Sequence, residues 1–449
     1  MRLITRNPEF NRNLWIEFSG QRAVVVPILF GLLLWLLFSL PDPPDTLGPV
    51  IEGAMLVIAG AALWLGGPYQ IAQGLFTEWE RHTWDIQRLS PITPWRLVWG
   101  KLFGSTVFVW YIGLCALLLY LVLPGWFGKH QPLPERWLMG ALFLSTAVML
   151  QACAFLSTLY SLRYGALFAR NVKRPSVTVA AFALLGVPPM LRLFTQSGEI
   201  LWYDNSYMPR VFLLGSSAVL SLWGVYGCYR ITRSDFLYRN GPLPWLLFTV
   251  FLAVWLAGLS QDAPVYTALT VSLVLLYVTL FSAPVDTLGL HHTLAFMRSG
   301  QWRRVGETLP LWTNTLPVVV VLLVYAMLAS PQGILPRSAV MQSAVGKLLT
   351  PGFYLSLTGF VARDICLLHL LYFSQRNQRA MGACFVYLAV LYVLIPSIMK
   401  TLDVQQLLGL FLPLPGQSLP LVWIEVLALG IWARQRWETY AAVAFAAPE

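Results

Sequence analysis

The residues best suited to chemistry inside the apolar segments of this sequence are Arg363, Asp364 and Glu425. An ionisable side chain in a membrane costs at least a few kcal/mol, so such groups usually face a bundle interior or a cavity. They can contact a substrate, form a gate or carry a proton. They can also form a structural ion pair, Arg363 with Glu425 or with Asp364, and the opposite charges favour this structural interpretation.

Two further patterns lack the residues that their chemistry needs. His291 and His292 are adjacent and would require His369 or Asp286 as further metal ligands, but no other residue at ligand spacing supports a metal site. Gly100-Lys101 and Gly346-Lys347 lack the earlier glycine and the following Ser or Thr of a phosphate-binding loop. We therefore expect no metal and no ATP bound by that route, and no catalytic residue.

Composition places these residues in a membrane protein. Of 449 residues, 57% are hydrophobic and only 11% are charged, and the mean hydropathy is +0.65. The surface of a soluble protein of this length needs far more charge. The apolar segments do not alternate in polarity, which predicts transmembrane helices, not a barrel.

Apolar segments separated by turn residues and charges predict an all-α polytopic protein with twelve transmembrane helices. The predicted spans are 24–40, 50–67, 101–123, 137–160, 176–195, 209–229, 245–260, 265–283, 316–330, 352–373, 382–398 and 419–433.

Most of the 30 basic residues fall at one set of span ends. By the positive-inside rule this predicts that both termini are cytoplasmic. The net charge of +10 is then a signal of topology and of attraction to anionic headgroups, and we expect no nucleic-acid partner. The expected location is the cell membrane, that is, the inner or plasma membrane, with lipid as a partner.

The link between the second and third spans, EWERHTWDIQRLSPITPWRLVWGK at residues 78–101, is unusually charged. A helix over 75–89 would place Leu75, Trp79, His82, Ile86 and Leu89 on one stripe. Glu78, Arg81, Asp85 and Arg88 would form a second stripe, spaced for ion pairs. Ser90-Pro91 would end this helix, and Thr93-Pro94 would begin the next with Thr93 as its N-cap.

This link resembles the signature of ABC-2 type transporter permeases, in which a cytoplasmic helix precedes a span that begins near G-K-x-x-G. The matching residues are Glu80, Arg81, Thr83, Asp85, Ser90, Pro91, Ile92, Thr93, Gly100, Lys101 and Gly104. NPEFNRNLWIEF, near the start of the chain, resembles the amphipathic N-terminal helix of that family. His82-Thr83-Trp84 departs from the usual Gly-Thr-Leu.

The resemblance implies that residues 75–92 are a coupling helix, which docks into a groove of a separate ATPase subunit, expected in two copies. The residues carried over to this role are Trp79, Glu80, Arg81, Thr83, Asp85, Ile86, Ser90 and Pro91. ATP and Mg²⁺ would bind to that partner, with no cofactor in this chain, and accessory or periplasmic subunits could complete the complex. A helix that only rests on the headgroups is the alternative.

The second half of the chain shows faint similarity to the first. GVPPMLR at 186–192 resembles LIPSIMK at 394–400, and PWRLV at 94–98 resembles QWRRV at 301–305, at a nearly constant separation. This predicts a six-plus-six repeat, with halves 1–230 and 231–449. The second link, 286–312, lacks the E-R-x-x-T-x-D core, so its contact with an ATPase stays open.

The sequence thus predicts the permease subunit of an ATP-driven exporter of unidentified substrate, which is not itself an enzyme. Two other functions stay open. Asp42 and Asp45, just outside the first span, are the kind of acidic residues that an integral-membrane glycosyltransferase would use. Asp364 and Glu425 would serve an ion- or proton-coupled carrier.

Overall fold

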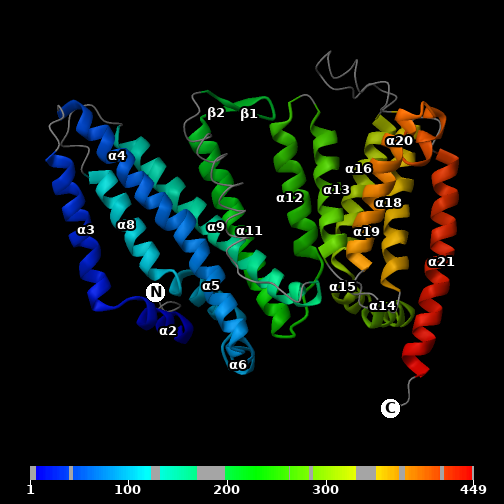
Figure 1. The fold of residues 1–449 in the computed structure, drawn as a ribbon, viewed down its shortest axis with the longest axis horizontal. Coiled ribbons are helices and arrows are strands. Elements are labelled where there is room, and N and C mark those ends of the chain that lie inside the picture. Colours follow the sequence, from blue (N-terminus) through cyan, green and yellow to red (C-terminus); the bar gives the residue numbers. More distant parts are fainter. Residues whose placement is uncertain are drawn as a thin grey trace. The chain divides into compact units, whose positions relative to one another are not determined.

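The computed structural model shows a largely helical chain with one short β-hairpin (Figure 1). It describes residues 7–39, 44–122, 132–168, 198–261, 263–282, 287–329, 350–373, 380–414 and 419–446. The chain divides into two compact units, residues 1–200 with 206–240 and residues 201–205 with 241–449. The predicted boundary after residue 230 falls within a helix, whereas the division by contacts comes after Asn240.

The first unit consists of helices that run from α2, near the start of the chain, to α11. Its elements are α2 (Pro8–Glu17), α3 (Gly20–Phe38), α4 (Pro44–Gly60), η1 (Ala61–Gly66), α5 (Gly67–Glu80), α6 (Thr83–Leu89), α7 (Pro94–Trp99), η2 (Gly100–Gly104), α8 (Val107–Val122), α9 (Leu133–Phe168) and α11 (Pro209–Asp235). Here η1 and η2 are π-helical turns within longer helices. The hairpin strands are β1 (Ile200–Trp202) and β2 (Asn205–Tyr207), and residues 201–205 of this hairpin are grouped with the second unit.

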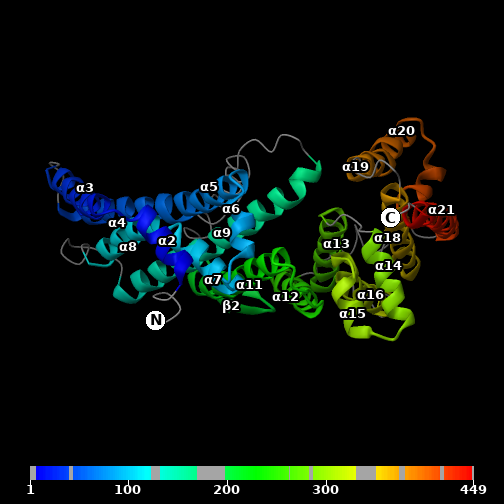
Figure 2. The ribbon, with the colours of Figure 1, turned by 90° about the horizontal axis from the view of Figure 1, so that it is seen from below.

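In this unit α4, η1 and α5 follow one another as a single long helix, which packs on α8 and α9 (Figures 1 and 2). Ile51, Met55, Leu63 and Tyr120 form the core between α4, η1 and α8. A second core lies near the end of α5, where Leu75 packs with residues of α6, α7 and α9. The short helix α2 is bent by 60° from α3 and packs against η2.

The second unit is built from consecutive helices and two short connecting helices. Its elements are α12 (Leu243–Leu259), α13 (Pro264–Ser282), α14 (Thr287–Arg298), α15 (Trp302–Thr308), α16 (Leu311–Ala329), α18 (Pro351–Tyr372), α19 (Ala380–Ala389), η6 (Val390–Leu394), α20 (Ile395–Thr401), η7 (Gln405–Leu410) and α21 (Leu419–Ala446). Leu276, Val319, Leu323 and Tyr354 form a core between α13, α16 and α18, and α21 packs along α18.

Seven helices in the described residues are long and apolar enough to cross a membrane, or nine if each of two bent pairs counts as one span. The seven are Gly48–Glu80, Leu133–Leu162, Pro209–Asp235, Pro264–Phe281, Leu311–Ala329, Pro351–Tyr372 and Gly382–Thr401. The bent pairs are Pro8–Glu17 with Gly20–Leu36 and Pro94–Gly104 with Val107–Val122. The chain is therefore an α-helical multi-pass membrane protein.

Nine of the twelve predicted spans coincide with these candidates. The predicted span 245–260 is the shorter apolar helix α12, and 176–195 lies outside the described residues. The predicted last span lies in α21, which carries Glu425, Arg434 and Arg436 and is not among the candidates. Twelve spans, the repeat and the cytoplasmic location of both termini stay predictions.

Candidate functional site

The charged link between α5 and α8 is not the continuous helix over 75–89 that its periodicity predicts. Helix α5 ends at Glu80, and His82 has a left-handed backbone with a φ of 55° before α6 begins. This conformation is uncommon for a residue with a Cβ atom and ends the regular hydrogen bonding. The later part of the prediction is confirmed, because Ser90 ends α6 and the Thr93 side chain caps α7.

The break changes which side chains are buried. Of the predicted apolar stripe, Leu75 is buried, whereas Ile86 is 67% and Leu89 89% exposed. Trp84, which lies off that stripe, is buried in its place at 2% exposure. The break at His82 rotates α6 relative to α5, so that Trp84 enters the core while Ile86 and Leu89 stay uncovered.

We call the exposed residues between Glu80 and Leu89 the α6 surface. They are Glu80, Arg81, His82, Asp85, Ile86 and Leu89. Two apolar side chains thus stand beside both acidic and basic groups. Trp79, Thr83 and Ser90 are half-buried below this surface, and Pro91 is exposed next to it.

Contacts on its inner side hold α6 in place. The Thr83 hydroxyl donates to the Glu78 carbonyl oxygen at 3.1 Å, across the break. The Arg88 Nε donates at 2.7 Å to the carbonyl oxygen of Asp235, at the end of α11, and Arg88 also pairs with Asp85 at 3.3 Å. The short helix is therefore anchored to α5 and to α11.

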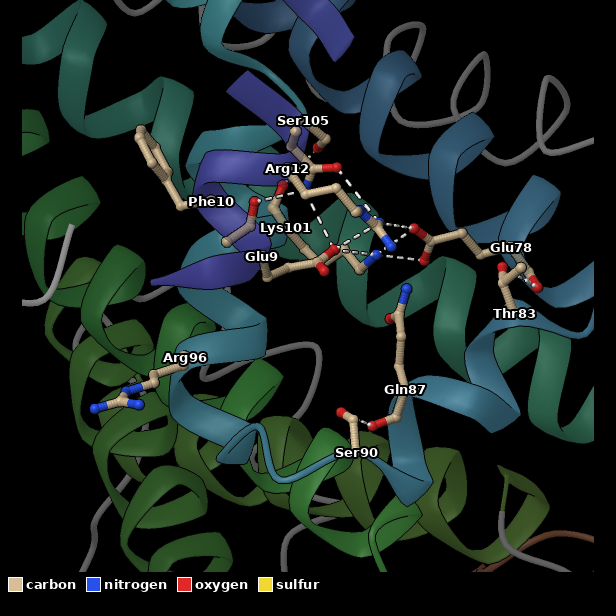
Figure 3. Close-up of polar contacts among 12 residues, drawn as sticks. Glu9, Phe10, Arg12, Glu78, Thr83, Gln87, Ser90, Arg96, Lys101 and Ser105 are labelled. Carbon is tan, nitrogen blue, oxygen red and sulfur yellow. Dashed lines mark hydrogen bonds and ion pairs between the residues drawn. The ribbon is translucent and has the colours of Figure 1, made fainter. Parts of the chain in front are cut away.

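Four charged residues, of which Glu9 and Lys101 are buried and Arg12 is exposed, form a group behind this link that we call the charged cluster (Figure 3). Lys101 pairs with Glu9 at 2.7 Å and with Glu78, and Arg12 pairs with Glu9 and with Glu78, each at 2.8 Å. The side chains of Glu9 and Lys101 are only 2% and 4% exposed. Two carboxylates and two cations thus neutralise one another and join α2, α5 and η2.

Two glycines allow α2 to approach closely enough for these pairs to form. A Cβ atom at Gly100 would lie 2.6 Å from the Glu9 Cγ, and one at Gly104 would lie 3.1 Å from the Asn13 Cβ. The Asn13 side chain donates to the Gly100 carbonyl oxygen at 3.1 Å. Asn7 caps α2 and donates to the Arg96 carbonyl oxygen at 2.7 Å. Small residues and buried amides therefore fix α2 to the helix that contains Lys101.

The charged cluster could not be found by considering the link alone. The predicted charged stripe spaces Glu78 to pair with basic residues of the same helix, whereas it pairs with Arg12 and Lys101. One signal was present in the sequence: Glu9 and Asn13 are four residues apart, as are Gly100 and Gly104. A polar pair at helical spacing can fit over a small-residue pair on a neighbouring helix.

The intramembrane candidates in the second unit also lie together. Arg363 donates to Glu425 at 3.1 Å and to Asp364 at 3.4 Å, and its guanidinium lies over the rings of Phe360 and Tyr392. Asp364 also accepts the hydroxyls of Tyr277 at 2.7 Å and Tyr392 at 2.8 Å. The cation and both carboxylates are thus satisfied within the unit.

The other candidate site residues are the histidines and the acidic residues outside the spans, and the described ones do not come together in a site. The rings of His291 and His292 lie 6.4 Å apart, and His369 contacts Trp312 and the Ile365 carbonyl. Within the described residues, no group of three metal-binding side chains gathers. Asp42 and Asp286 lie outside the described residues, as does the side chain of Asp45. The second link contains α14 and α15, which Thr293 and Thr308 join by a hydrogen bond of 2.8 Å.

We compared the chain with protein-family models, curated proteins and solved structures, and none of them matches it.

Proposed function

We propose that this chain is the membrane permease subunit of an ATP-driven exporter in the cell membrane, and that a separate ATPase subunit docks on the α6 surface. The observation that carries the proposal is the position of that surface directly beside the charged cluster. A partner that moved α6 would act through Glu78 on Arg12 and Lys101 and hence on α2 and η2.

The composition of the α6 surface supports a protein partner. Ile86 and Leu89 would pack into an apolar groove of the ATPase. Glu80, Arg81 and Asp85 would make charged contacts at the edge of that groove and so fix the position of α6 in it. In this proposal ATP and Mg²⁺ bind to the ATPase, two copies of which would drive alternating access through the helices. The substrate is left open, since nothing in the site selects one.

The competing interpretation is a segment that rests on the membrane surface. It also uses exposed apolar and basic side chains, but acidic residues such as Glu80 and Asp85 would be repelled by anionic headgroups. The two interpretations differ in whether an ATPase is required, and that difference can be measured.

The test is to purify the tagged chain from its native membranes in mild detergent and to identify what accompanies it. We expect a stoichiometric ATPase subunit, which is lost in the variant Glu80→Lys/Asp85→Lys. Glu438→Lys, at an exposed position on α21, is the matched control and should retain the ATPase. A chain that arrives alone, and is unchanged by the double substitution, would refute the exporter proposal.

An ion- or proton-coupled carrier is the second candidate, because Asp364 is a nearly fully buried carboxylate within a candidate span. Its two tyrosine donors and Arg363 equally suit a structural role. Transport that an uncoupler abolishes while ATP is maintained would favour the carrier, whereas transport that persists would favour the exporter.

A further inference from the structure

The first unit contains an apolar groove on the side of α2 opposite the charged cluster. Its volume is about 710 Å³, within the range of roughly 300–1,000 Å³ that is typical of small-molecule sites. Phe10, Leu14 and Phe18 line it from α2, four residues apart and therefore on one stripe. The charged cluster and the groove thus use two different faces of one short helix.

Aromatic rings form the opposite wall. Trp99 stacks on Phe103 with centroids 4.7 Å apart, and Phe103 contacts Trp110 at 5.9 Å. At the far end, the rings of Phe18 and Tyr111 meet edge to face at 5.3 Å. Such a wall suits an extended hydrocarbon chain, since it offers a continuous apolar contact with almost no polar atom to desolvate.

Exposed apolar side chains next to the groove indicate that it opens towards the bilayer. Both of its walls belong to bent pairs of helices, each of which is long and apolar enough to cross a membrane when its two segments are counted together. On the outer face of α2, Trp15 is 85% and Ile16 64% exposed, as expected for a helix that lies in the membrane interface. An acyl chain would therefore reach the groove directly from the bilayer.

Two polar groups at the Asn7 end favour an anionic phospholipid over an uncharged apolar molecule. Arg96 is exposed, and no carboxylate in the described parts of the chain pairs with it. Figure 3 shows Arg96 and Phe10 projecting away from the charged cluster on the same side. The buried indole N–H of Trp99 also lacks a hydrogen-bond acceptor among the described residues. A lipid phosphate could pair with Arg96, and an ester oxygen could accept from Trp99.

We infer that this groove binds one acyl chain of an anionic phospholipid, whose headgroup pairs with Arg96. The inference is independent of the proposed function, because it needs only the membrane location and the geometry of α2, α7, η2 and α8. Its consequence is that α2 is held in place from both sides, by the charged cluster on one face and by a lipid on the other.

The test uses the full chain in nanodiscs with a trace of phosphatidylglycerol or phosphatidylcholine that carries a diazirine in one acyl chain. After irradiation, labelled peptides are mapped by mass spectrometry. We expect the phosphatidylglycerol probe to label groove residues such as Phe103 and Trp110 in preference to the outward-facing residues of α3. Equal labelling of both regions would mean ordinary bilayer contact and would overturn the inference.

Val107→Trp fills the groove and should remove this labelling, whereas Leu118→Trp, at a 61% exposed position of α8, should not.

Arg96→Gln should lower the preference for phosphatidylglycerol roughly fivefold, the effect of about 1 kcal/mol for one basic group at an anionic surface. Arg81→Gln, also exposed, is its control. Because Arg96→Gln removes only an exposed charge, it tests the inference even if Val107→Trp fails to fold. An unchanged preference would overturn the inference. So would labelling that appears only when residues 2–6 are deleted, because the groove of the full chain would then hold that segment and not a lipid.

Discussion

Glu9 and Lys101 come from segments far apart in the sequence, yet they form an ion pair of 2.7 Å in which both side chains are almost completely buried. Each residue also has a second partner: Glu9 forms an ion pair with Arg12, and Lys101 forms one with Glu78. Buried ions are tolerated only when their partners satisfy them. Helix α2 is therefore held to η2 by a buried ion pair, and removal of either partner leaves the cluster with one charge in excess.

Replacing Lys101 by Met should strongly destabilise the first unit, since it leaves the two carboxylates of Glu9 and Glu78 with Arg12 as their single cation in the cluster. We expect a loss of about 3–5 kcal/mol, the usual effect of breaking a buried pair on one side. The measurement is the denaturation midpoint of the detergent-purified chain. Arg303→Gln, which removes a side chain that is 95% exposed, should leave the midpoint unchanged. Equal midpoints for the two variants would contradict the burial of this pair.

The contact between α2 and η2 should be sensitive to a single methyl group at Gly100. Gly100→Ala places a Cβ atom 2.6 Å from the Glu9 Cγ and 3.0 Å from the Phe10 backbone nitrogen, so α2 must shift. Overpacking of this kind typically costs about 1–3 kcal/mol. In Gly74→Ala the added Cβ atom has no neighbour within 4 Å, and the helix should be neutral or slightly more stable. Limited proteolysis near α2 and thermal denaturation would both report the difference.

Substitution of the apolar part of the α6 surface should separate partner binding from stability. Ile86→Ser/Leu89→Ser changes side chains that are already exposed, so stability should stay within about 0.5 kcal/mol of the native chain. Copurification of the ATPase should nevertheless be lost, because the apolar contact with its groove is removed. Retention of the ATPase by this variant would place docking elsewhere, for which the second link is the next segment to test.

In the second unit, the Arg363 side chain should be needed for stability. Arg363→Met leaves Asp364 and Glu425 without their cation, and we expect a loss of about 3–5 kcal/mol. The control Arg434→Gln removes a side chain that is 79% exposed and should have little effect. If Arg363→Met is as stable as the native chain but abolishes transport, the residue serves the substrate and not the fold.

Local signals in the sequence predicted much of the local structure. The Thr93-Pro94 start of α7 was predictable because a side-chain cap and a proline at the first turn act within a few residues. Nine spans were likewise predictable from the length and continuity of apolar segments. These features depend on neighbours along the chain and not on tertiary contacts.

Tertiary contacts decided the features that the sequence did not predict. Periodicity assigned His82 to the middle of a helix, yet burial of Trp84 accompanies a left-handed turn at that residue. In the same way, the four members of the charged cluster come from three separate segments, and no local pattern pairs Glu9 with Lys101. Helix periodicity indicates which face of a helix is apolar, but not which other helix will cover a polar residue.

The ion pair between Glu9 and Lys101 also constrains how this protein is made. At a synthesis rate of roughly 5–20 residues per second, the ribosome needs on the order of 5 to 20 seconds to proceed from Glu9 to Lys101. During that interval Arg12 is the one cation of the charged cluster that has been made, and the buried pair of Glu9 with Lys101 cannot yet form. Helix α2 can therefore dock on η2 only after the start of the third hydrophobic segment has been synthesised, so its final position is reached later than its own synthesis.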